Sequence, residues 1–277
     1  MEKAYSGKVV LVTGGTRNTG FAIVKRFLRD GATVFFCGRT AESTRRGEEA
    51  LAADGFAGGW RGVPCDVSRK ADVDALYDVI EREAGHLDVV VSNAVDFGLA
   101  QGGPLDMTEE QFLEVLNTNL LGCFRVVQGA CRRFFMRQER RPETGQRGVV
   151  VVIGSNSSER VSRRRTSYCS AKGGMDALVK SLAVDLGPEG IRVNMVAPGF
   201  INTDRWDFLP DEIKARRRAC TLTGRESTGD DVAAAVAFLA SDGARTFQGA
   251  RLVMDSGVTS QLLPAMCEDD TSTMRYR

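Results

Sequence analysis

The sequence predicts an α/β fold: a Rossmann-like doubly wound parallel sheet with helices on both faces, formed as a single domain. Strand-like and helix-like patterns alternate along the whole chain. The strand-like segments are apolar throughout, which is typical of parallel strands covered on both faces. Their alternation with helices indicates repeated right-handed crossovers. No linker, repeat or low-complexity segment divides the chain, so we expect one domain over residues 1–277.

Each element follows from its local pattern, because short β-branched runs predict strands and apolar residues at helical spacing predict helices. Thr108 is the expected N-cap of the fourth helix, with Gln111 three residues later. Residues 202–228 interrupt the alternation as an insertion, and the polar tail 264–277 is expected to be loosely held. Strands are expected at 9–12, 33–37, 60–65, 87–92, 149–153, 191–196 and 252–254. Helices are expected at 18–30, 42–53, 71–83, 108–138, 167–186 and 230–239.

Charge and composition argue against several classes of function. The 37 basic and 36 acidic residues nearly cancel, so we expect neither nucleic acid nor an anionic membrane as a partner. We find no signal-peptide core and no apolar run long enough to span a bilayer. Seven cysteines without a C-x-x-C pair are expected to be reduced, which predicts a cytoplasmic protein. His86 is the single histidine, which excludes a multi-histidine metal site, and no metal is expected.

A glycine-rich segment follows the first predicted strand and opens the first helix. A strand, loop and helix in this order present free backbone N–H groups and a positive helix end to a pyrophosphate. Glycine allows the backbone to approach the phosphates closely. The sequence therefore predicts a dinucleotide site formed by Gly14, Thr16, Arg17, Asn18, Thr19 and Gly20.

The end of the second strand predicts which dinucleotide binds. In NAD sites an acidic residue here accepts hydrogen bonds from the ribose 2′-hydroxyl, but this sequence has Gly38, Arg39 and Thr40. The guanidinium of Arg39 can instead pair with a 2′-phosphate. We therefore predict NADP(H) as the cofactor; the alternative is that Arg39 is a solvated loop residue.

Tyr168 and Lys172 lie four residues apart in a predicted helix and so share one face. A free tyrosine has a pKa of about 10, and a nearby ammonium group lowers it by stabilising the phenolate. The pair therefore predicts a tyrosine that exchanges a proton with a substrate. A tyrosine and a lysine at this spacing often occur by chance. The pair is therefore evidence for a catalytic site only together with the other motifs of the chain.

Further motifs recur in order along the chain. They are Asp66-Val67, Asn93-Ala94, Asn119, Ser155, Pro198-Gly199, Ile201, Thr203 and Asp255-Ser256-Gly257. Over residues 6–260 the set resembles the short-chain dehydrogenases/reductases of the single-domain type, and among them the 3-oxoacyl-carrier-protein reductase-like ketoreductases. The family fingerprint T-G-x-x-x-G-x-G is matched except at Asn18, and asparagine tolerates the left-handed backbone of such a turn. Val95 and Ser256 also depart from the family pattern.

The resemblance implies a role for each residue. Tyr168 would be the general acid and Ser155 would orient the substrate carbonyl. Lys172 would lower the pKa of Tyr168 and contact the nicotinamide ribose, while Asn119 would hold a water that links Lys172 to solvent. Arg17 would face the 2′-phosphate. The remaining cofactor contacts would come from Asp66, Val67, Asn93, Pro198, Gly199, Ile201 and Thr203.

Two segments are expected to border the substrate. Residues 202–228 follow the family's P-G motif and would form a helical lid. Its Trp206, Phe208 and Leu209 would touch the substrate or only pack the lid down. The loop before Tyr168 carries arginine at 160 and 163–165, which would receive an anionic or carrier-linked ketone or form a solvated cluster.

Three functions remain open at this point. The first is NADP(H)-dependent reduction of a ketone to a secondary alcohol. The second is an alcohol, sugar or cyclitol dehydrogenase that works oxidatively. The third is a non-catalytic dinucleotide-sensing regulator, against which the intact catalytic set argues. The resemblance also implies a homotetramer or homodimer formed through the helices at 108–138 and 167–186.

Overall fold

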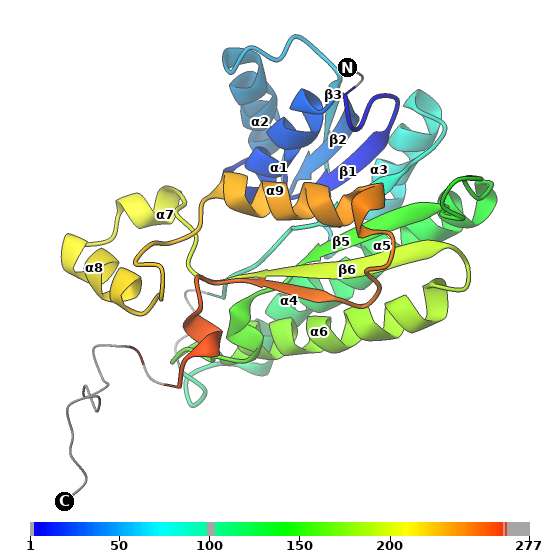
Figure 1. The fold of residues 1–277 in the computed structure, drawn as a ribbon. Helices are drawn as coiled ribbons and strands as arrows, with labels where there is room; N and C mark the ends of the chain where they lie inside the picture. Colours follow the sequence, from blue (N-terminus) through cyan, green and yellow to red (C-terminus); the bar gives the residue numbers. More distant parts are fainter. Residues whose placement is uncertain (1–2, 99–102, 263, 265–277) are drawn as a thin grey trace, which may run out of the picture.

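The protein is built on one parallel sheet, seen here in a computed structural model that describes residues 3–98, 103–262 and 264 (Figure 1). The strand order is β3-β2-β1-β4-β5-β6-β7, and every pairing is parallel, so the predicted doubly wound sheet is confirmed. Strand order reverses between β1 and β4, and in sheets of this topology ligands bind at the carboxyl ends of the strands beside such a reversal. The strands are β1 (Val9–Thr13), β2 (Thr33–Gly38), β3 (Trp60–Pro64), β4 (Val89–Ser92), β5 (Gly148–Ile153), β6 (Ile191–Pro198) and β7 (Arg251–Met254).

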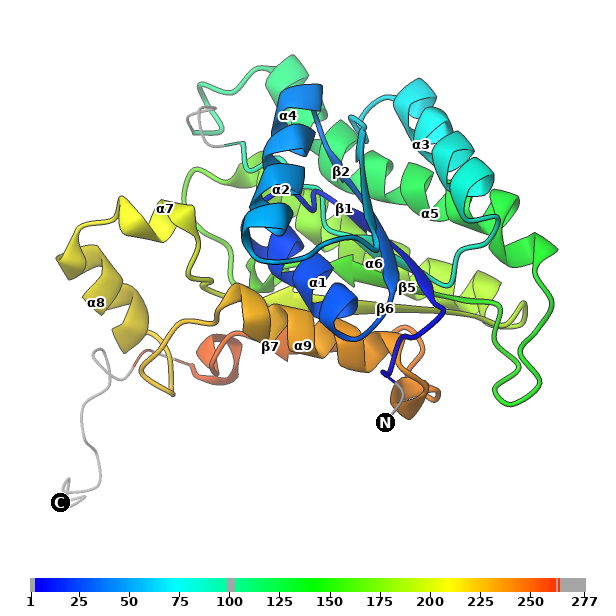
Figure 2. The ribbon, with the colours of Figure 1, turned by 90° about the horizontal axis from the view of Figure 1, so that it is seen from above.

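Helices cover both faces of the sheet, and each face has its own apolar core (Figure 2). Val73 of α3, Val126 of α5 and Met175 of α6 are buried in one core. Val24 of α1 and Val236 of α9 are buried in the other. The helices around the sheet are α1 (Asn18–Arg29), α2 (Ala41–Ala53), α3 (Lys70–Glu83), α4 (Glu109–Leu116), α5 (Gly122–Arg133), α6 (Thr166–Leu186) and α9 (Gly229–Ala240).

The single helix expected over residues 108–138 is instead divided. It consists of α4, a π-helical turn at Asn117–Leu121, α5 and a 3-10 turn at Phe135–Arg137. The expected capping box of Thr108 and Gln111 is present. A single π turn inside an α-helix is rare, and such turns occur frequently at functional sites. The turn contains Asn119, one of the expected catalytic residues.

Residues 202–228 project from the sheet as two short helices, α7 (Asp204–Asp207) and α8 (Asp211–Ala219) (Figure 1). Trp206 anchors them: it is 4% exposed, and the guanidinium carbon of Arg217 lies 5.4 Å from its ring. The expected tail, 264–277, lies outside the described residues apart from Pro264. No helix within the described part of the chain is both long and apolar enough to cross a membrane.

Candidate active site

The glycine-rich loop after β1 has the backbone that its sequence predicts. Gly14 has a φ of 64° and Asn18 a φ of 50°, so both adopt the left-handed conformation. Asparagine therefore preserves the turn where the fingerprint has glycine. A Cβ atom at Gly20 would lie 2.0 Å from the carbonyl oxygen of Gly14, so only glycine fits where the loop meets α1.

The N-terminus of α1 suits an anion. Arg17 occupies the N-cap position without a side-chain cap, and the first turn contains no acidic residue. The first backbone N–H groups of a helix lack partners within the helix and carry partial positive charge. This helix end and the close backbone at Gly14 and Gly20 fit the pyrophosphate of a dinucleotide.

Asn93 and Thr13 join the carboxyl ends of β4 and β1. The Nδ2 of Asn93 donates to the carbonyl oxygens of Thr13 and Gly14, each at 3.0 Å. The Oγ1 of Thr13 accepts from the backbone N–H groups of Asn93 and Ala94, at 3.0 and 3.1 Å. Both amide protons of Asn93 are therefore used to hold the glycine-rich loop in place.

Arg17 and Arg39 lie at the ends of β1 and β2, where the adenosine ribose is expected. Both are exposed, and the residue after Arg39, Thr40, caps α2. The Nη1 of Arg17 lies 3.3 Å from the Oδ2 of Asp204 in α7. The glycine-rich loop is thus linked directly to the segment 202–228.

Tyr168 and Lys172 lie on one face of α6, and both are buried. The Nζ of Lys172 donates to the carbonyl oxygen of Ile153 at 2.8 Å and lies 5.8 Å from the centroid of the Tyr168 ring. Burial lowers the pKa of Lys172 to about 8, because the interior disfavours the charged ammonium. The predicted pairing on one helical face is therefore present.

The pKa of Tyr168 departs from expectation. Burial raises it above the ordinary tyrosine value, and this effect exceeds the opposing hydrogen bond from Ser155 and the positive charges of Arg165 and Arg205. The expectation that Lys172 produces a net lowering is thus wrong for this geometry. Desolvation is the largest effect, and the groups that oppose it are Ser155 and the two arginines.

Ser155 follows β5 at the same edge of the sheet and is buried. Its Oγ accepts from the backbone N–H of Ser157 at 3.1 Å. Arg251 of β7 holds this turn, since its Nη2 donates to the carbonyl oxygen of Ser155 at 3.1 Å. Arg251 also pairs with Glu159 at 2.8 Å and with Asp176 of α6 at 3.4 Å. It therefore connects the serine turn to the helix that carries Tyr168.

Asn119 is buried in the π turn, and its side-chain amide forms two hydrogen bonds with the loop after β4. Its Oδ1 accepts from the backbone N–H of Asp96 at 2.7 Å, and its Nδ2 donates to the carbonyl oxygen of Asp96 at 2.8 Å. Asn119 thus holds the segment that carries Phe97 over the site.

The comparisons with known proteins agree with this geometry. Residues 14–259 match the family model described as enoyl-(acyl carrier protein) reductase. The chain belongs to the short-chain dehydrogenase/reductase family. It is 34% identical over 253 residues to the 3-oxoacyl-[acyl-carrier-protein] reductase FabG of Haemophilus influenzae, covering 91% of this chain and 98% of that protein. It is 35% identical over 256 residues to the reductase MabA of Mycobacterium avium, covering 92% and 91%.

A solved structure has the same fold. The crystal structure of gox2181 superimposes with a TM-score of 0.84 at 32% identity, covering 94% of this chain and 99% of that one. The present chain is therefore an oxidoreductase of the short-chain dehydrogenase/reductase family.

The other positions of the family pattern lie along the same edge. The backbone N–H of Gly199 donates to the carbonyl oxygen of Met254 at 3.0 Å, and a Cβ there would meet that of Asp255 at 2.6 Å. Ser256, which stands where the family has glycine, has a φ of 54°. Asp66 and Val67 follow β3, and Pro198, Gly199, Ile201 and Thr203 lie at or just after the end of β6.

The four arginines expected at the substrate mouth have different surroundings. Arg160 donates to the carbonyl oxygens of Thr259 and Gln261, while Arg163 and Arg164 are exposed. Among these four, Arg165 contacts Tyr168: its guanidinium carbon lies 4.4 Å from the ring centroid.

The two aromatic residues expected in the lid also differ in their exposure to solvent. Trp206 is buried as an anchor, whereas Phe208 is 86% exposed. Two further neighbours of Tyr168 are not identified by any local motif in the sequence: Phe97, which stacks on its ring, and Arg205, which lies over the ring of Phe97.

Proposed function

We propose that this protein is an NADPH-dependent ketoreductase that converts a ketone to a secondary alcohol with Tyr168 as general acid. The observation that carries the proposal is the geometry around the buried phenol of Tyr168, which is hydrogen-bonded to Ser155 and lies one helical turn from the ammonium group of Lys172. The phenol is protonated at neutral pH and so holds the proton that a developing alkoxide would accept. The relatives named 3-oxoacyl-[acyl-carrier-protein] reductases support a ketone substrate.

The proposed roles follow from the contacts of each residue. When bound, the reduced nicotinamide supplies a hydride to the carbonyl carbon. Tyr168 donates its proton to the carbonyl oxygen, and the Ser155 hydroxyl orients that oxygen. Lys172 donates one N–H to the carbonyl oxygen of Ile153, and its two other N–H groups would bind the nicotinamide ribose. Asn119 positions the loop after β4, and the water between it and Lys172 remains a prediction.

Cofactor selection is proposed to rest on charge. The guanidinium groups of Arg17 and Arg39 would bind the 2′-phosphate of NADPH, since no carboxylate lies at the end of β2 to receive a 2′-hydroxyl. The pyrophosphate would lie against Gly14, Asn18 and Gly20 at the start of α1. Thr203 would contact the carboxamide.

The two alternative functions have less support. An oxidative alcohol, sugar or cyclitol dehydrogenase would use the same residues in the reverse direction, and the relatives named as reductases favour the reducing direction. A dinucleotide sensor does not need the hydrogen bond between Ser155 and Tyr168.

The cysteines favour a cytoplasmic setting for the protein. None of those described forms a disulfide: Cys37, Cys65, Cys123, Cys131, Cys169 and Cys220.

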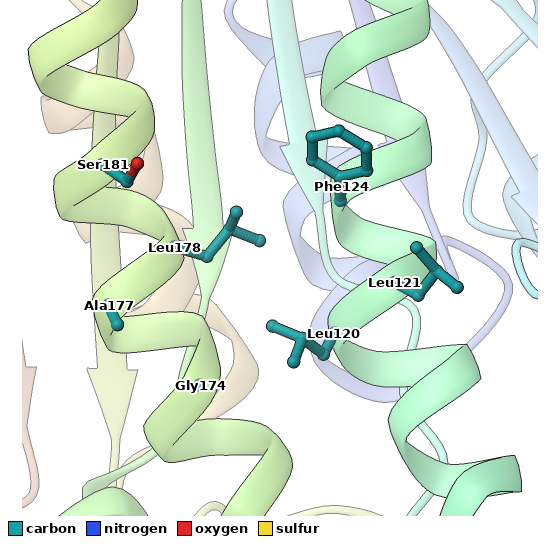
Figure 3. Close-up of a pocket in the computed structure, with 7 residues that line it drawn as sticks. All are labelled: Leu120, Leu121, Phe124, Gly174, Ala177, Leu178 and Ser181. Atoms are coloured by element: carbon teal, nitrogen blue, oxygen red, sulfur yellow. The ribbon is translucent and has the colours of Figure 1, made fainter.

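A second copy of the chain is the proposed partner. An apolar hollow of about 450 Å³ lies on the outer faces of α6 and the helix that contains the π turn. Leu120 and Leu178 point toward one another across it (Figure 3), and Leu121 beside them is 43% exposed. Covering this face in a homodimer or homotetramer would remove apolar surface from water. Sedimentation velocity is expected to show an oligomer that Leu121→Glu weakens; a monomeric unaltered protein at assay concentration would overturn this assembly.

The central test is Tyr168→Phe. The variant is expected to lose at least about a hundredfold in kcat for ketone reduction, because general acid catalysis contributes that much. Its Kd for NADPH, measured by nucleotide fluorescence, should stay close to the unaltered value, because the ring is kept. A kcat within twofold of the unaltered enzyme would refute the role of Tyr168.

A further inference from the structure

Two guanidinium groups and two aromatic rings form a compact cluster at the catalytic hydroxyl. The rings of Phe97 and Tyr168 stack with centroids 5.8 Å apart and planes inclined by 15°. The guanidinium carbon of Arg165 lies 4.4 Å from the Tyr168 centroid and 5.9 Å from that of Phe97. The guanidinium carbon of Arg205, from α7, lies 3.5 Å from the centroid of Phe97. Residues from three separate segments therefore place two positive charges beside the proton donor.

Among the residues described, neither arginine forms an ion pair with a carboxylate; the adjacent Asp204, which pairs with Arg17, raises the pKa of Arg205 only through space. Nearby arginines do form such a pair: Arg17 pairs with Asp204 at 3.3 Å, and Arg251 pairs with Glu159 at 2.8 Å. The Nε of Arg165 is buried and forms no hydrogen bond. A ring satisfies the flat face of a guanidinium, but its five N–H groups point outward in the guanidinium plane and still need acceptors. These two side chains therefore have unused capacity for an anion.

The charges of Arg165 and Arg205 act on the phenol of Tyr168. The positive charges of Arg165 and Arg205 both lower the pKa of the Tyr168 phenol, although burial outweighs them. Both side chains are only partly exposed, so solvent screens them less than it screens Arg163 or Arg164, which are open to water. An anion held by these groups would lie within a few bonds of the carbonyl oxygen that receives the proton.

We propose that Arg165 and Arg205 bind a carboxylate of the substrate, which makes that substrate a small 2-oxo or 3-oxo acid rather than a carrier-bound thioester. This inference rests on the proposed ketoreductase function and specifies its substrate class. The hydride adds to the ketone carbon, the carbonyl π pair takes the proton of Tyr168, and the products are a hydroxy acid and NADP⁺. The carboxylate stays bonded to the two arginines throughout. A thioester has no charge at that position and leaves both guanidinium groups unpaired.

The test compares acids with their esters. Steady-state kcat and KM are measured with NADPH for 2-oxobutanoate and 3-oxobutanoate, for their ethyl esters, and for the N-acetylcysteamine thioester of 3-oxobutanoate. The enzymes are the unaltered protein, Arg165→Gln, Arg205→Gln and the control Arg163→Gln from the same loop. Thermal unfolding and the Kd for NADPH are measured for each variant to verify its fold. A second readout needs no turnover: binding of butanoate, which lacks the ketone, to each protein loaded with NADP⁺.

The unaltered enzyme is expected to favour one of the acids over its ester. Loss of either active-site arginine should lower kcat/KM for the acid about tenfold to a hundredfold, mainly through KM, because hydrogen bonds to charged groups contribute on that scale. The ester should change by less than about threefold, and Arg163→Gln should match the unaltered enzyme. Butanoate binding should weaken in parallel with the acid.

Other results overturn the inference. Equal losses for acid and ester would mean that the cluster only packs the active site. A preference for the ester or thioester would mean that the substrate carries no nearby charge. If no ketone is reduced, the proposed function fails, and butanoate binding alone then decides the anion site: binding that depends on both arginines supports it, and its absence refutes it.

Discussion

Replacing Asp204 by asparagine is expected to tighten the binding of NADPH. The Oδ2 of Asp204 lies 3.3 Å from the Nη1 of Arg17, so this carboxylate competes with the proposed 2′-phosphate for one guanidinium. The two side chains are 43% and 76% exposed, and an exposed pair of this kind contributes about 0.2–1 kcal/mol. Removing the competitor should therefore lower the Kd for NADPH by about 1.4-fold to fivefold.

Asparagine is the suitable replacement because the backbone N–H of Asp204 also donates to the Oδ1 of Asn18 at 3.0 Å, and the substitution leaves that bond in place. NADH lacks the 2′-phosphate, so its Kd should not change. Fluorescence titration with both nucleotides at low salt measures the difference. At about 1 M salt, where the Debye length is about 3 Å, the gain should largely disappear.

The matched control is Asp207→Asn, which removes an exposed carboxylate from the same short helix, α7. It should leave the affinity for both nucleotides unchanged. Equal tightening of NADH and NADPH by Asp204→Asn would refute competition for the 2′-phosphate, as would weaker binding of NADPH.

Three further predictions concern the parts that surround the tyrosine. Gly20→Ala places a Cβ atom 2.0 Å from the carbonyl oxygen of Gly14, so it should abolish detectable NADPH binding in a fluorescence titration and destabilise the fold by about 1–3 kcal/mol on urea unfolding. Arg251→Met should lower kcat for ketone reduction about tenfold by releasing the turn that carries Ser155, while the Kd for NADPH stays constant; an unchanged kcat would exclude this positioning role. Lys172 has a pKa of about 8 when folded against about 10.4 when unfolded, so the unfolded chain binds more protons between these values and stability should rise with pH across that window. Lys172→Met should remove this rise in the free energy of unfolding, and a variant with the same pH dependence as the unaltered protein would contradict the assignment.

Much of the fold and the cofactor site could be predicted from the sequence because the signals are local. Unbroken apolar strands alternating with helices indicated the parallel sheet, and its topology places Gly14, Arg39, Ser155 and Tyr168 at one edge. The left-handed backbone at Asn18 was also predictable, since it depends on the conformational preference of a single residue.

Other features depend on contacts between distant segments, and only the tertiary structure decided them. The π turn around Asn119, the support of Ser155 by Arg251, and the stacking of Phe97 on Tyr168 have no local signature. The direction of the pKa shift at Tyr168 belongs to the same group. The sequence placed Lys172 one helical turn away and so predicted a lowered value. Burial raises it instead, because desolvation is set by everything that packs around the phenol rather than by its neighbours along the chain.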